Sequence, residues 1–356
     1  MRGQKRQQVS LLTLRSPEQM VPKGHPLRRV KELADQTLAA MSAQFDAMYS
    51  QVGRPSIPPE RLLKSLLLIA FHSVRSERLF CEQLHYNMLF RWFLDMGLDE
   101  DAFDASTFSQ NRERLLKHDV GALFLMQVVE RAKTMGLMSD DHFSVDGSLI
   151  EAWASMKSFQ KKDAPQKPPD DPGNPTIDFH GEQRSNETHE SKTDPDARLA
   201  RKGNGKESKL AHHAHALVEN RNGLVVGIMV TAATGRAERE AALQMLEENH
   251  PRGRGSSVGG DKGYDSKDFV QECREMNVTP HVAQKKYSAI DGRTTRHAGY
   301  AVSQRFRKRI EEVWGWMKTV AGFRKTRYRG QPRVNLSAQL FAAAYDLLRI
   351  AKLSPT

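Results

Sequence analysis

The stretch His142-Phe143-Ser144-Val145-Asp146-Gly147-Ser148-Leu149-Ile150 decides the fold. Its alternation predicts a short buried strand, with apolar side chains on one face and Asp146 on the other. Burying a lone carboxylate is costly unless it is paired, hydrogen-bonded or bound to a cation. The strand therefore indicates a partner for Asp146 elsewhere in the chain. The alternative is an aspartate that only caps a turn at Gly147.

The composition favours a polyanionic partner. The chain has 356 residues, enough for two domains or for one with a large insertion, and a formal net charge of +11. Such a charge favours nucleic acid first and an anionic membrane surface second. No apolar run reaches the ~18 residues that span a bilayer, and no apolar segment follows the basic residues 1–8, so we expect no signal peptide.

Cysteine usage indicates the compartment. Cys81 and Cys273 lie far apart and form no metal-binding pair motif. A reduced intracellular protein without a structural zinc site is therefore expected. We expect a cytoplasmic protein associated with the nucleoid.

The first part of the chain is expected to be all-helical. Apolar spacing and Pro58-Pro59 predict the helices, which are expected over 27–51, 59–70, 77–93, 106–116 with Ser106 as N-cap, and 120–135. Short helices with several arginines among them are typical of a helix-turn-helix DNA reader. We therefore expect a DNA-end-binding domain over 1–136. A helical domain with solvated arginines is the alternative.

The sequence after the helical region predicts a mixed β-sheet. After the strand at 142–150, residues 161–209 are polar and read as a flexible insertion. The elements expected next are a hairpin (214–218 and 224–230, turning at Asn222-Gly223), a helix at 238–248, strands at 257–261 and 278–282 with a helix between them, and helices at 302–320 and 336–351.

This order is the plan of a ribonuclease H-like α/β fold, a mixed sheet flanked by helices. The expected catalytic domain comprises 137–160 and 210–333. The C-terminal helix, within 334–356, is expected to pack on it.

A second carboxylate, Asp261, stands at the end of the strand expected at 257–261, after Gly259 and Gly260. The carboxyl end of a strand is a usual place for a ligand in an α/β sheet. The alternative is that the aspartate caps the next helix. Asp265 or Ser266 is expected to cap that helix, with Asp265 a better cap than Asp261, which leaves Asp261 free for function.

A third carboxylate lies on the helix expected at 302–320. At 3.6 residues per turn, one face of this helix carries a cation, a carboxylate, an aromatic ring and a second cation: Arg307, Glu311, Trp314 and Lys318. If this face meets Asp146 and Asp261, three repelling carboxylates converge. Mg²⁺ resolves such a conflict, and two ions about 4 Å apart suit phosphoryl transfer. A surface helix with an Arg307–Glu311 pair is the alternative.

Together, these blocks resemble the signature of DDE transposases from bacterial insertion sequences, in the group that includes the IS-five elements. The blocks are 145–148, 260–265 and Arg307-x3-Glu311-x6-Lys318. That register selects Glu311 over Glu312 as the third acid. The block at 191–198, the hairpin with His215 and the helical region at 55–114 also resemble this group. Gln304 stands where the signature usually has tyrosine, so a tyrosine contact to the DNA backbone is not expected.

The resemblance implies a cut-and-paste recombinase. It would bind the terminal inverted repeats of its element, cleave the ends with metal-activated water and join the freed 3′-hydroxyl to target DNA. Asp146, Asp261 and Glu311 would hold two Mg²⁺ ions, with Mn²⁺ as a substitute. Arg307 and Lys318 would lie along the DNA backbone. A homodimer on paired ends is expected.

Positive charge is dense around this third block. Residues 305–333 contain ten Arg or Lys against Glu311 and Glu312 alone, which predicts a salt-dependent grip on phosphates. Arg324, Lys325 and Arg327 are therefore expected to bind DNA. Trp314 or Trp316 is expected either to stack on a displaced base or to pack in the core.

Three further hypotheses concern a zinc site and two other functions. His212, His213 and His215 invite a zinc site, but only two of them share a strand face and no third ligand is close. Two other functions are also open: a ribonuclease H-like endonuclease that does not join strands, and a DNA-binding regulator without catalysis. Three acids in register argue against the regulator.

Overall fold

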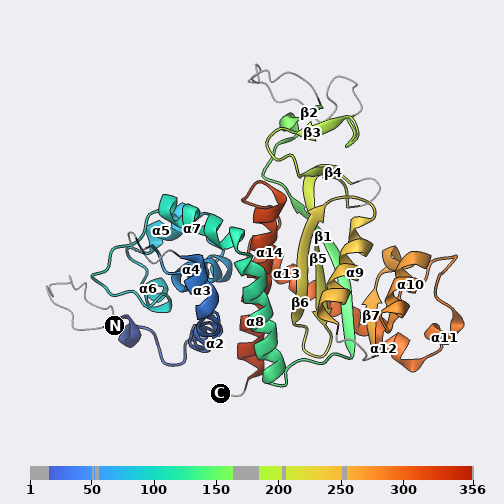
Figure 1. The fold of residues 1–356 in the computed structure, drawn as a ribbon, viewed down its shortest axis with the longest axis horizontal. Coiled ribbons are helices and arrows are strands. Elements are labelled where there is room, and N and C mark those ends of the chain that lie inside the picture. Colours follow the sequence, from blue (N-terminus) through green and yellow to red (C-terminus); the bar gives the residue numbers. More distant parts are fainter. Residues whose placement is uncertain are drawn as a thin grey trace, which may run out of the picture.

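A helical region and a mixed sheet lie on the two sides of one long helix, α14 (Gln331–Leu353) (Figure 1). The computed structural model describes residues 16–49, 52, 56–162, 184–202, 206–250 and 255–354. α14 packs against strand β6 (Val225–Ala232) on one side and against the helical region on the other. Among the described residues, no helix is long and apolar enough to cross a membrane.

The helical region follows the expected outline with more breaks. Its helices are α1 (Pro17–Met20), α2 (Leu27–Ala40), α3 (Ser42–Met48), α4 (Pro59–Phe71), α5 (Glu77–Gln83), α6 (Met88–Phe93), α7 (Ala105–Lys117) and α8 (Val120–Thr134). The helix expected over 27–51 breaks at Met41, whose backbone leaves the helical range. The helix expected over 77–93 also breaks, because the Asn87 side chain accepts a hydrogen bond from Phe90 N and starts a new helix.

The cap predicted for α7 was wrong by two residues. Asp104, not Ser106, is the N-cap, and its Oδ1 accepts from Ser106 N at 2.8 Å and Thr107 N at 3.0 Å. Ser106 and Thr107 hydroxyls also donate to this carboxylate. These bonds hold the pKa of Asp104 well below its usual range.

The sheet has the strand order of a ribonuclease H-like fold, as predicted. Its strands are β1 (His142–Glu151), β4 (Arg198–Ala200), β5 (Lys209–Glu219), β6, β7 (Ser256–Gly260) and β8 (Val278–Val282). β1, β5 and β6 pair antiparallel in sequence order, and β7 and β8 continue from β1 in parallel. Gly223, with a φ of +73°, makes the predicted hairpin turn.

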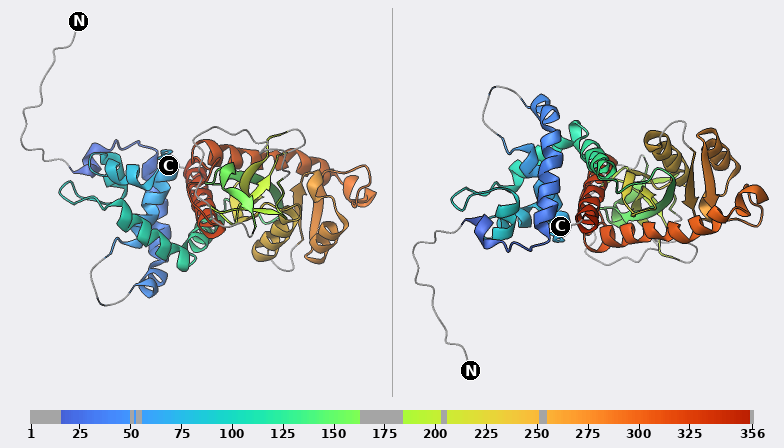
Figure 2. Two further views of the ribbon diagram at one scale, coloured as in Figure 1. Left: turned by 90° about the horizontal axis from the view of Figure 1, so that it is seen from above. Right: turned by 90° about the horizontal axis from the view of Figure 1, so that it is seen from below.

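Helices cover both faces of this sheet. α9 (Ala237–Asn249) and α10 (Lys267–Glu275) lie on one face, and α12 (Ala298–Phe306) and α13 (Ile310–Thr319) lie on the other (Figure 2). The short helix α11 (Gly292–Thr295) precedes α12. The predicted helix over 302–320 is not continuous, because a 3₁₀ turn, η3 (Arg307–Arg309), separates α12 from α13.

The expected insertion is folded wherever it is described. β2 (Phe159–Lys161) pairs with β3 (His189–Ser191), and β4 pairs with β5 beside β6. η1 (Met156–Ser158) precedes β2. The expectation of a flexible segment is therefore wrong for residues 184–202, and much of the remaining insertion lies outside the described residues.

A buried polar contact explains why this part folds. Asp194 and His212 are both fully buried, and their Oδ2 and Nε2 atoms are 2.9 Å apart. Asp194 Oδ1 also accepts from Gly330 N, just before α14, at 3.2 Å. The block at 191–198 thus holds the insertion against β5 and the start of α14. The expected domain boundaries stay predictions.

Truncating the core of α14 should destabilise the whole chain. Leu347 is fully buried, so we expect Leu347→Ala to lower the free energy of unfolding by about 2–5 kcal/mol. The measurement is urea denaturation followed by circular dichroism. Lys352→Ala, at an exposed position of the same helix, should change it by less than about 0.5 kcal/mol. Equal effects of the two substitutions would contradict the central position of α14.

Candidate functional site

The site forms where β1 runs on past its parallel neighbour. β7 pairs with β1 only over His142–Ser144, whereas β5 pairs with β1 as far as Glu151. Asp146 therefore lies on an edge that β7 no longer covers. Asp261 is the first residue after β7. Ser144 of β1 is paired with Gly259 of the parallel strand β7, so Asp146 and Asp261, each two residues further along, come to the same level of the sheet.

A cavity of about 870 Å³ opens at this edge, and the three predicted acids Asp146, Asp261 and Glu311 all line it. Its lining includes a fourth carboxylate, Glu238, from the first turn of α9. The other polar or aromatic lining side chains are Ser148, Arg201, Lys202, His213, Thr234, Trp314, Lys318, Thr319 and Arg324. Acidic and basic side chains thus share one open cavity.

The electrostatics are unfavourable for ionised carboxylates here. Burial, together with the neighbouring charges of Glu238 and Asp261, raises the pKa of Asp146 to about 7, against the opposing influence of Gly147 N–H and Arg307. Burial and Asp261 also raise the pKa of Glu238. Among the described residues, no Lys or Arg forms an ion pair with any of the four acids. The cavity therefore favours binding of a cation.

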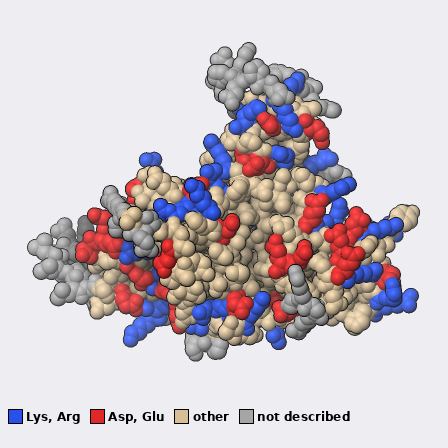
Figure 3. Space-filling model, viewed as in Figure 1, with Lys and Arg blue, Asp and Glu red and all other residues tan. Residues whose placement is uncertain are grey.

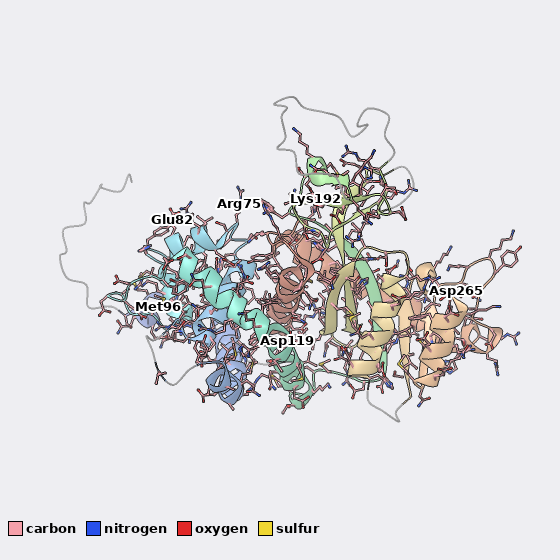
Figure 4. All side chains as sticks on the ribbon, turned by 45° about the horizontal axis from the view of Figure 1, so that its top comes forward. Arg75, Glu82, Met96, Asp119, Lys192 and Asp265 are labelled. Atoms are coloured by element: carbon pink, nitrogen blue, oxygen red, sulfur yellow. The ribbon has the colours of Figure 1, made fainter. Side chains whose placement is uncertain are left out.

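Contrary to the prediction that it is not a cap, Asp261 caps a local turn. Its Oδ1 accepts from Gly263 N at 2.6 Å and caps the 3₁₀ turn η2 (Lys262–Tyr264). Asp265 does not cap α10, where Ser266 is the N-cap. Instead, Asp265 (Figure 4) accepts from Lys285 N at 2.7 Å and Ala289 N at 2.8 Å. The cap nevertheless leaves Asp261 exposed at the cavity.

The structure separates the two adjacent glutamates of α13. Glu311 lines the cavity, whereas Glu312 faces α14, with its Oε2 3.8 Å from Arg349 Nη1. The two tryptophans of α13 also differ, one lining the cavity and the other facing α14. Trp314 lines the cavity at 6% exposure, and Trp316 packs edge-on against Tyr345 of α14 with ring centroids 5.7 Å apart. Glu311 is therefore the glutamate that can act with the two aspartates.

Some of the cations predicted to bind DNA reach the cavity. Lys318 and Arg324 line it, and the Lys318 ammonium donates to Ser148 Oγ on β1. Burial and the charges of Lys202 and Arg324 lower the pKa of Lys318. Arg307 does not line the cavity; its Nε donates to Gln304, and its charge acts on Asp146.

Two other predicted DNA-binding cations have structural partners. Lys325 Nζ lies 2.9 Å from Glu151 Oε1. Arg327 donates to the carbonyl of Val74 in the helical region. Neither residue lines the cavity.

Sequence reasoning missed two residues of the site. Glu238 reads as an ordinary acid in the first turn of a helix, and no spacing links it to Asp146. His213 reads as one of three nearby histidines, but its ring lines the cavity, and burial and Lys318 lower its pKa to about 4. Its neighbour His215 instead bonds Thr231 Oγ1 at 2.8 Å. Only the pairing of β5 with β1 places His213 here.

The oxygen ligands present suit Mg²⁺ or Mn²⁺. Within the described part of the chain, no three acidic, histidine or cysteine side chains are arranged around one point that a metal ion fits. Mg²⁺ does not require such a cage, since it keeps several waters and uses one or two carboxylates together with substrate phosphates. Asp146, whose pKa is raised by burial and by the charges of Glu238 and Asp261, fits a cation site of this kind.

Two family models match the sequence. The family described as "Transposase domain (DUF772)" matches residues 15–114, in the helical region. The family described as "Transposase DDE domain" matches residues 177–347, from the insertion into α14. β1 with Asp146 lies between the two matches. Neither family model identifies the IS-five-like group, so that finer assignment stays a prediction.

Several solved structures are also similar at low identity. A piggyBac transposase synaptic complex with hairpin DNA is 11% identical over 92% of this chain and 75% of that one, with a TM-score of 0.44. A Mos1 paired-end complex with the left transposon end is 10% identical over 85% of this chain and 98% of that one, with a TM-score of 0.20. The strand order, and not these similarities, carries the fold assignment.

A ribonuclease H-like sheet with acids gathered in a cavity at one open edge defines the class of metal-dependent enzymes that act on phosphodiesters. Since both transposase models match, the chain belongs to the DDE transposases. It is a DNA transposase, which cleaves DNA and joins strands.

Removing the charge at position 146 should stabilise the metal-free protein. The folded pKa of Asp146 is about 7 and the unfolded value is about 3.9, so its ionisation costs stability progressively as the pH rises between the two. In EDTA, we expect Asp146→Asn to raise the free energy of unfolding by about 1–4 kcal/mol at pH 8 and to change it little at pH 4.

Urea denaturation at both pH values measures this effect. Glu240→Gln, at an exposed position of α9, is the matched control and should have no effect at either pH. A gain from Asp146→Asn that is the same at pH 4 and pH 8 would show that burial does not raise the pKa of Asp146.

Proposed function

We propose that this transposase binds the terminal inverted repeats of its own insertion sequence, cleaves the element ends and joins their 3′-hydroxyls to target DNA. The observation that carries the proposal is the single cavity lined by Asp146 of β1, Asp261 after β7 and Glu311 of α13. These acids come from three distant parts of the chain, and all three are oxygen donors suited to hard divalent cations.

In this proposal, Asp146, Asp261 and Glu311 hold two Mg²⁺ ions, with Mn²⁺ as a substitute. Bound divalent ions supply positive charge that activates water and stabilises the attacking and leaving oxygens of the phosphodiester. The three carboxylates fix the ions at the open edge of the sheet, where a DNA strand has access. Lys318 and Arg324 contact the backbone phosphates beside them.

The surface supports an approach of DNA from the side of β2 and β3. Basic side chains gather there, between the helical region and the β2–β3 projection, whereas acidic side chains gather over α9 and α10 (Figure 3). Arg75, just before α5, and Lys192, just after β3, lie on this side (Figure 4). Arg201 and Lys202 continue the positive charge into the cavity.

We further propose that residues 1–136 form the DNA-end-binding domain and that two copies of the chain act on paired ends, at the nucleoid. The arginines of the helical region, such as exposed Arg75 and Arg78, support this domain role. The short helices α5 to α7 are compatible with a helix-turn-helix reader.

The two glutamates of α13 give a matched test of the catalytic assignment. We expect Glu311→Gln to lower end cleavage and strand transfer by at least about 100-fold, because it removes a metal ligand. Glu312→Gln, which only loses its contact with Arg349, should keep near-normal activity. The substrate is plasmid DNA carrying the sequences that flank the coding region, with Mg²⁺ added.

Binding to the same DNA in a mobility-shift assay should be retained by both glutamate variants. Equal loss of activity in the two variants, or loss only in Glu312→Gln, would refute the assignment of Glu311. Cleavage without joined products in the unmodified protein would instead indicate an endonuclease.

Lys318 should contribute to the grip on DNA. We expect Lys318→Ala to weaken binding and to lower the slope of log affinity against log salt by about 0.9, the value for one phosphate contact. Fluorescence anisotropy between low and moderate salt gives this slope. The control is Lys352→Ala, near the C-terminal end of α14 and outside the cavity lining, which should leave this salt slope unchanged. An unchanged slope in Lys318→Ala would rule out its contact with phosphate.

A further inference from the structure

The carboxyl group of Glu238 lies between the two strands that carry the predicted aspartates. Its Oε1 accepts from Gly147 N at 3.1 Å, next to Asp146 on the free edge of β1. Its Oε2 approaches the turn after β7, 3.7 Å from the place where a Cβ on Gly263 would lie. Glu238 therefore spans the gap between β1 and the turn that follows Asp261.

The packing around Gly147 fixes this position. A Cβ on residue 147 would lie 2.8 Å from Glu238 Oε1 and 2.6 Å from His213 Nε2. Such distances are too short for ordinary contact, so glycine at position 147 makes room for the carboxylate. The backbone of β1 and the Glu238 side chain are fitted to one another.

A structural role does not explain why this side chain is charged. The neutral amide of a glutamine could serve both polar neighbours of this side chain, because its oxygen accepts from Gly147 N–H and the Tyr264 hydroxyl can donate or accept. A carboxylate instead adds a third negative group beside Asp146 and Asp261, and no described Lys or Arg forms an ion pair with it.

A buried hydroxyl also belongs to this cluster. Tyr264 is 1% exposed, and its hydroxyl interacts with the Glu238 carboxylate, although outside standard hydrogen-bond geometry. Burial and the charges of Glu238, Asp146 and Asp261 raise its pKa. The ring therefore closes the protein side of the carboxylate cluster and leaves the cavity as its open side.

We propose that Glu238 is a fourth carboxylate ligand of the divalent-cation centre, beside Asp146, Asp261 and Glu311. The proposal rests on the proposed function of this cavity. With four carboxylates, two are available for each of two cations, which matches the one or two carboxylates that Mg²⁺ takes alongside water and phosphate oxygens. The charge of Glu238, and not only its hydrogen bond to Gly147, is then required.

The test compares Mn²⁺ binding by the full chain without DNA, measured by electron paramagnetic resonance. We expect Glu238→Gln to weaken Mn²⁺ binding by at least about 10-fold, although its amide oxygen still accepts from Gly147 N and preserves the fold. Glu240→Gln is the matched control from the same helical turn and should bind Mn²⁺ as the unmodified chain does. Unweakened binding by Glu238→Gln would overturn the proposal.

A second variant separates loss of the charge from a change in folding. Glu238→Asp keeps the charge with a shorter reach and should bind Mn²⁺ more tightly than Glu238→Gln does. The reverse order would show that the hydrogen bond, and not the charge, matters at this position, and would overturn the proposal. Thermal melting in EDTA checks that each variant is folded.

Asp146→Asn separates this proposal from the proposed function. If Asp146→Asn loses Mn²⁺ binding and Glu238→Gln keeps it, the metal centre stands and only the fourth ligand fails. If both variants bind Mn²⁺ normally, the assignment of the cavity as the metal centre fails together with the role of Glu238.

Discussion

The mutual repulsion of carboxylates at the open edge of β1 is the constraint on which the site depends. β7 stops pairing at Ser144, and the strand continues alone on that edge through Asp146. Asp261, Glu311 and Glu238 then enter the same cavity from three other segments. Burying Asp146 beside these groups costs stability in the absence of cations, because burial and the neighbouring carboxylates raise its pKa. The fold tolerates this cost because β5 holds the other edge of β1.

The basic segment after α13 contacts both the cavity and the helical region. Arg324 reaches the cavity, whereas Arg327 and Tyr328 hold the helical region in place. The Tyr328 hydroxyl donates to Glu77 at 3.0 Å, and the Arg112 guanidinium lies 4.5 Å from the centre of its ring. The position of the helical region relative to the cavity is therefore coupled to residues that directly follow the helix of Glu311.

Much of the fold was predictable because its signals are local. The alternation around Val145, the Asn222-Gly223 turn and the apolar helices gave the strand order and the helical region. Some errors were local, such as the break at Asn87 and the cap at Asp104, and others fell where a tertiary contact decides. Asp194 reads as part of a polar insertion, but its buried contact with His212 fixes residues 184–202 against the sheet. The role of Asp265 likewise depends on Lys285 and Ala289, which are remote in sequence.

The site shows the same division. The sequence by itself determined that Asp146 lies on the polar face of β1, that Asp261 follows the glycines of β7, and that Glu311 and Lys318 share one face of α13. The reason is that strand alternation and helical faces follow from spacing. Only the tertiary structure decided that Glu238 and His213 join them, and that Lys325 and Arg327 are occupied elsewhere. The reason is that convergence at a cavity depends on how strands and helices pack, and no local periodicity encodes which side chains meet there.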